Sequence, residues 1–74
     1  MFDPTYLAER LSGPKKRRLC ELAHAGQSLP FKRTDNALQA FGLIERYTGV
    51  TDDAFTELTS KGMEVAQVIV GRGL

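Results

Sequence analysis

Residues 41–62, "FGLIERYTGVTDDAFTELTSKG", decide the fold, because two short alternating segments stand on either side of a turn. Residues 43–48 and 54–58 alternate apolar and polar side chains, which is typical of half-buried strands. Residues 49–53, GVTDD, favour a turn. An isolated hairpin is only marginally stable in water. The sequence therefore predicts a β-hairpin that packs on helices through Leu43, Ile44 and Leu58.

Two helices are predicted on the N-terminal side of this hairpin. The first begins after Asp3, a good N-cap, with Pro4 at its first position. The second runs from about residue 14 to residue 25 and ends at Gly26. The residues expected to face inward are Tyr6, Leu7 and Leu11 in the first helix, and Leu19, Leu22 and Ala23 in the second.

Two more helices flank the hairpin directly. A short third helix is capped by Thr34 and ends before Gly42, and residues 27–31 before it are expected to form a loop or a short extended piece. Its inner face is predicted to hold Ala37, Leu38 and Phe41, and its outer face Asp35, Asn36 and Gln39. A last helix begins after Thr59, with an apolar stripe of Leu58, Gly62, Val65, Ala66, Ile69 and Val70.

Length and composition exclude several classes of protein. The chain has 74 residues, 42% hydrophobic and 26% charged, which is typical of one globular domain over residues 1–74. A single cysteine, and an N-terminus without a basic start and an apolar run, favour a cytoplasmic protein. The longest apolar run near the end, VIV, is too short to cross a membrane.

The sequence carries no recognisable catalytic pattern. His24 and Cys20, each the only residue of its type, are too few ligands for a metal site. We find no glycine-rich phosphate loop, no nucleophile with a matched base and no paired carboxylates of a catalytic cleft. We therefore expect no metal, no cofactor and no enzyme activity.

Two phrases resemble a known family. "NALQAFGLIER" at residues 36–46 and "ELTSKGMEVA" at residues 57–66 are similar to the phrases L…GLIxR and LTxxGxxxA of MarR-type winged helix-turn-helix regulators. The resemblance covers about residues 33–70 and implies an α+β winged-helix domain, in which three helices are followed by a β-hairpin wing and a C-terminal helix. One departure is the connection at residues 26–33, which is longer than the turn of a helix-turn-helix. Either this turn is lengthened or a helix of the family is absent.

Charged and amide side chains supply the candidate DNA contacts. Residues 1–33 hold seven Lys or Arg against three Asp or Glu, a split that is typical of an anion-binding face but that chance also produces. Phosphate contacts are predicted around the second and third helices, and adenine contacts from amides on the third. The candidates are Lys15, Lys16, Arg17, Arg18, Lys32, Arg33, Thr34, Asn36, Gln39 and Arg46. In the alternative interpretation they are ordinary surface residues, and Thr34 is only a cap.

These features predict a DNA-binding winged-helix protein, a small transcriptional regulator of phage or mobile-element type. Its partner would be double-stranded DNA, and a homodimer through the first and last helices would suit two-fold symmetric sites. The hairpin is acidic, with Asp52 and Asp53 at its tip, so the helices rather than the hairpin are expected to meet DNA. The alternative is a protein–protein interaction module that uses the winged-helix surface. Basic residues gathered beside the third helix would favour DNA, whereas scattered ones would favour a protein partner.

Overall fold

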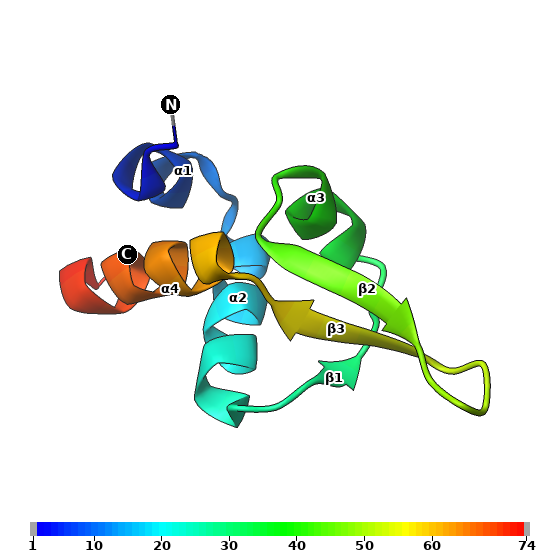
Figure 1. Cartoon of the computed structure of the whole chain (residues 1–74). Helices are drawn as coiled ribbons and strands as arrows, with labels where there is room; N and C mark the ends of the chain where they lie inside the picture. Colours follow the sequence, from blue (N-terminus) through cyan, green and yellow to red (C-terminus); the bar gives the residue numbers. More distant parts are fainter. Residues whose placement is uncertain (1, 74) are drawn as a thin grey trace.

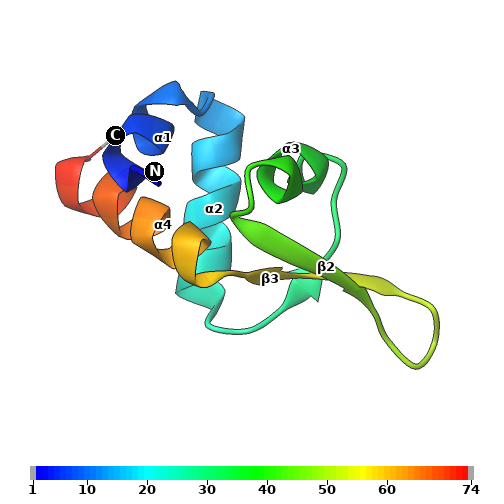
Figure 2. The same ribbon diagram turned by 45° about the horizontal axis from the view of Figure 1, so that its top comes forward.

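The computed structural model describes residues 2–73 and has an α+β architecture, with four helices and a three-stranded antiparallel sheet (Figure 1). Along the chain the elements are α1 (Pro4–Arg10), α2 (Gly13–Ala25), β1 (Leu29–Pro30), α3 (Asp35–Ala40), β2 (Ile44–Thr48), β3 (Ala54–Leu58) and α4 (Ser60–Arg72). The hairpin of β2 and β3 projects from one side of the helices, and its loop lies far from α1 and α4 (Figures 1 and 2).

The predicted hairpin is confirmed, and a third strand extends it. Ile44 stands opposite Leu58 and Thr48 opposite Ala54, so the turn is residues 49–53. On the other edge of β3, β1 pairs antiparallel, with Leu29 opposite Thr56, which gives the strand order β1-β3-β2. The long connection between α2 and α3 is therefore partly a strand. Pro30 fits this short strand because proline lacks the amide hydrogen of a central strand and is tolerated at an edge.

The core lies where the four helices meet the base of the hairpin. Leu19 of α2, Leu38 of α3 and Val65 of α4 are completely buried, together with Leu43 just before β2. In Figure 2, α1 and α4 lie next to one another, α2 runs beside them with its lower part behind the start of α4, and α3 lies beside the sheet. The rest of the core consists of Ala8, Leu11, Leu22, Ile44, Ala66 and Ile69.

The predicted helix boundaries at α1 and α4 are confirmed by their hydrogen bonds. The Asp3 carboxylate accepts from the amides of Thr5 and Tyr6 at 3.0 and 3.3 Å. The Thr59 hydroxyl accepts from the amide of Gly62 at 3.1 Å and donates to the carbonyl of Gly42 at 2.7 Å. A Cβ atom on Gly62 would overlap the Leu43 carbonyl oxygen, so the close approach of α4 to the start of β2 requires glycine there.

Three residues predicted to face the core are instead exposed. Tyr6, Phe41 and Val70 expose 56%, 45% and 57% of their surface. Phe41 follows the last residue of α3, and the chain then turns at Gly42 with a φ of 77°, so Leu43 takes the buried position instead. Tyr6 and Val70 lie on helix faces that no other element covers in the described part of the chain.

Within residues 2–73, none of the helices has the length and apolar character needed to cross a bilayer.

Candidate nucleic-acid interface

A buried ion pair joins α2 to the start of α3. The Nε and Nη2 atoms of Arg18 donate to the two carboxylate oxygens of Asp35 at 2.9 and 3.0 Å. The Asp35 side chain is fully buried and also accepts from the hydroxyl of Thr56 in β3, at 2.8 Å. Two parallel hydrogen bonds between opposite charges are among the strongest in proteins. This cluster therefore links α2, α3 and the central strand of the sheet.

Both members of the pair remain charged. Burial disfavours the Asp35 carboxylate most strongly, but the hydrogen bonds from Arg18, the Lys32 amide and Thr56 together outweigh it and lower the pKa of Asp35 below its ordinary value. The hydrogen bond to Asp35 likewise raises the pKa of Arg18. The charges compensate each other, which a buried ion needs in order to remain ionised.

Two predictions about this cluster are wrong. Arg18 was expected to contact phosphate and Asp35 to lie on the outer face of α3, yet only 5% of Arg18 and none of Asp35 is exposed. The reason is that Arg18 stands four residues before Leu22 and so on the buried side of α2. That spacing is the signal in the sequence that could have revealed a buried arginine, whereas its partner comes from a distant segment.

The same cluster holds the chain before α3 in place. Arg18 donates to the carbonyl of Pro30 at 2.8 Å, and Asp35 accepts from the amide of Lys32 at 2.9 Å. The amides of Asp35 and Asn36 donate to the carbonyls of Lys32 and Arg33. The side chains of Lys32 and Arg33 are both exposed. Their backbone is fixed by these hydrogen bonds.

The start of α3 differs from the prediction in a second respect. Thr34 adopts a helical conformation, and its side chain makes no capping hydrogen bond. Since the first amides of α3 already have carbonyl partners, they are not free to bind a phosphate. An anion at this place would be bound by the side chains of Lys32 and Arg33 rather than by the end of the helix.

Arg46 joins these two cations from the hairpin. It stands opposite Thr56, and directly opposed residues of an antiparallel pair project to the same face, so Arg46 lies on the face turned toward Asp35 and α3. Its guanidinium carbon is 5.0 Å from the centre of the Phe31 ring, next in the chain to Lys32. We define Lys32, Arg33 and Arg46 as the α3-side cations. None of the three forms a salt bridge with another residue of the described chain.

The basic run at residues 15–18 is divided by the fold. Arg18 is buried, and Lys15 is half-buried one helical turn before it. Lys16 and Arg17 instead line a surface hollow with Cys20, His24 and Ile69 of α4. Because this hollow is shared with α4, Lys16 and Arg17 belong to a different side of the molecule from the α3-side cations.

The same hollow contains the Cys20 side chain. Burial raises the pKa of the Cys20 thiol, so the thiol is the favoured form.

The two amide candidates both lie on the surface of α3. Asn36 and Gln39 are exposed and three residues apart, so they share one side of the helix. The helix has only six residues, about 9 Å of helical rise. Such a short element offers few positions from which side chains could reach base edges.

The described residues contain no group of three His, Cys, Asp or Glu side chains arranged to bind a metal. Searches with this chain find no matching family model, no matching curated protein and no matching solved structure.

Proposed function

We propose that this protein binds double-stranded DNA with the surface around α3, as a small winged-helix transcriptional regulator of phage or mobile-element type. The observation that carries the proposal is the grouping of the α3-side cations Lys32, Arg33 and Arg46 beside the exposed amides of Asn36 and Gln39. Cations without acidic partners on one side of a small domain form the electrostatic footprint expected of a nucleic-acid binder.

The order of the elements supports the winged-helix assignment. Three helices precede a β-hairpin and a fourth helix follows it, and the hairpin extends beyond α3 (Figure 1). The acidic residues of the strands, Glu45 and Glu57, stand opposite each other on the face of the sheet away from Arg46. The hairpin therefore offers DNA its basic side, although its overall charge is negative.

Each side chain has a distinct role in this proposal. Lys32, Arg33 and Arg46 contact phosphates, which gives affinity without sequence selectivity. Three such contacts predict a slope of about −2.7 in a log–log plot of affinity against salt concentration. Asn36 and Gln39 contact base edges in the major groove, where an amide pairs well with adenine.

The proposal is tested by titrating duplex DNA over a series of salt concentrations. Arg33→Ala and Arg46→Ala should each weaken binding on every sequence and flatten the slope by roughly one unit. Arg17→Ala is the matched control, because it removes the same charge from the other side of the molecule and should leave the slope nearly unchanged. Gln39→Ala should cost ~1–3 kcal/mol on a selected site and little on a scrambled one.

Two results would count against this function. An absence of duplex binding at low salt would exclude it altogether. Equal losses from Arg17→Ala and Arg33→Ala would show that attraction by overall charge, and not the surface around α3, accounts for the binding.

A further inference from the structure

The face of the sheet that points away from α3 combines acidic and aromatic side chains. Glu45 stands opposite Glu57, and Tyr47 opposite Phe55, so all four project to the same side. The Tyr47 and Phe55 rings are stacked with their centroids 6.0 Å apart. Glu45, Tyr47 and Glu57 are exposed and Phe55 is half-buried. We call these four residues the outer sheet face.

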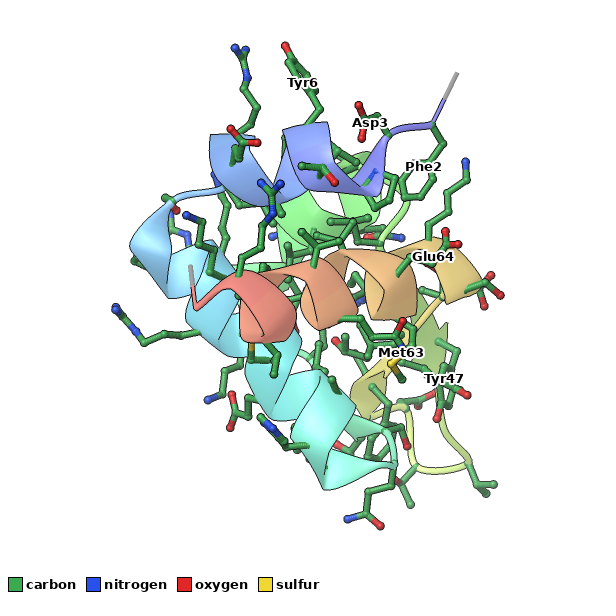
Figure 3. The ribbon with its side chains drawn as sticks, turned by 90° about the vertical axis from the view of Figure 1, so that its left-hand side faces the viewer. Phe2, Asp3, Tyr6, Tyr47, Met63 and Glu64 are labelled. Atoms are coloured by element: carbon green, nitrogen blue, oxygen red, sulfur yellow. The ribbon has the colours of Figure 1, made fainter. Side chains whose placement is uncertain are left out.

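An apolar hollow continues this face toward the helices. Glu57 borders a hollow of ≈180 Å³ whose other walls include Leu22 and Ala23 of α2, Leu58 of β3 and Met63 of α4. Figure 3 shows Met63 on the side of α4 nearer to Tyr47 and the hairpin, and Glu64 on the side nearer to Phe2. The outer sheet face and the hollow thus form one continuous surface that is largely apolar and carries two carboxylates.

Glu45 and Glu57 repel each other, and no cation of the described residues pairs with either of them to offset this repulsion. Like charges directly opposite each other on neighbouring strands destabilise a sheet. A cationic partner placed over the strands would relieve this repulsion, and exposed tyrosine and methionine side chains are typical of the surfaces that proteins use for binding.

We propose that the outer sheet face and its hollow bind a protein segment that carries paired arginines or lysines next to large apolar side chains. The cations pair with Glu45 and Glu57, while the apolar side chains contact the Tyr47–Phe55 stack and enter the hollow beside Met63. This surface faces away from the α3-side cations, so the inference does not depend on DNA binding. Charge complementarity selects the partner, because opposite potentials favour one class of partner and repel another.

The test uses two-dimensional amide NMR spectra of the free protein. The probe is a short synthetic peptide with paired arginines flanked by leucine and phenylalanine. A second peptide has glutamates in place of the arginines, and a third has serines in place of the apolar residues. We expect that, of the three peptides, only the first will cause saturable shifts of amide resonances, centred on β2, β3 and Met63. Shifts elsewhere, or equal shifts from the third peptide, would overturn the proposal.

A substitution separates binding from folding. Glu57→Lys should weaken the binding of the first peptide by roughly tenfold. The same substitution should raise the melting temperature of the protein, because a lysine at this position faces Glu45. Glu64→Lys is the matched control, since it changes the net charge equally but lies on the side of α4 near Phe2. Equal weakening by the two variants would overturn the proposal. If the same resonances shift when the protein is concentrated without any peptide, this face binds a second copy of the chain. That result would also overturn the proposal of a separate protein partner.

Discussion

The base and the tip of the hairpin differ in what holds them, although the same two strands form both. At the base, Ile44 and Thr56 are buried, Thr56 donates a hydrogen bond to Asp35, and Gly62 of α4 packs against Leu43 just before β2. At the tip, Val50 is fully exposed and the turn is closed by its own hydrogen bonds between Gly49, Asp52 and Asp53. Alternating side chains are present along both strands, but only the base gains the helix contacts that a hairpin needs to be stable in water.

The largest effect is expected from breaking the buried ion pair. Asp35→Ala leaves the buried, charged Arg18 with only the half-exposed Glu21 as an ionic partner, which should cost ~3–5 kcal/mol. A domain of this length has about 4–11 kcal/mol of stability in total, so the substitution should remove a large fraction of it. Arg17→Ala is the control, because Arg17 is the exposed neighbour of Arg18 and should change stability by about 0.5 kcal/mol or less. Similar urea midpoints for the two variants would contradict the assignment of the pair.

The second effect concerns the junction of α4 with the base. Gly62→Ala places a methyl group against the Leu43 carbonyl and 2.9 Å from the Cδ2 atom of Leu58. Backbone cannot move aside as a flexible side chain can, so the change should cost ~1–3 kcal/mol. Gly71→Ala provides the comparison within the same helix, because a methyl group there meets no atom within 4 Å. Thermal unfolding of both variants measures the difference, and an undiminished Tm for Gly62→Ala would show that the junction is looser than described.

The third prediction concerns acid. Because the pKa of Asp35 is lowered in the folded state, its contribution to stability is complete above the ordinary aspartate pKa of about 4 and is lost as the pH falls further. The stability gap between the wild type and Asp35→Asn should therefore be wide at neutral pH and should narrow below about pH 4. Urea unfolding over a pH series measures this gap. A gap that stays constant into acid would mean that Asp35 is not ionised in the folded protein.

The smallest effect is expected at the tip. Asp52 has a φ of 66°, in the left-handed region that glycine adopts without strain. Asp52→Gly should change the free energy of unfolding by less than about 0.5 kcal/mol, because relief of strain offsets the greater freedom of the unfolded chain. Asp52→Ala should cost at most ~1–2 kcal/mol. A larger loss from Asp52→Gly than from Gly62→Ala would reverse the ranking of tip and base.

Local patterns in the sequence were enough to predict most of the elements. The turn at residues 49–53 and strand β3 lie where the alternation predicted them, and β2 begins one residue later than the alternating segment. As predicted, α1 begins directly after Asp3, α2 ends directly before Gly26 and α4 begins directly after Thr59. These boundaries are predictable because capping depends on neighbours in the chain. For the same local reason, the amides of Asn36 and Gln39 were predicted to be exposed, and they are.

The sequence by itself thus determined the helices, the hairpin and the main apolar faces, since each depends on residues within a few positions of one another. Only the tertiary structure decided which charges are available for binding. Arg17 and Arg18 are adjacent and chemically identical, yet one is exposed and the other pairs with Asp35, seventeen residues away. Likewise, Arg46 lies beside Phe31 only because β3 brings β1 and β2 into one sheet. The burial of a charge depends on a distant partner, and no local pattern in the sequence specifies that partner.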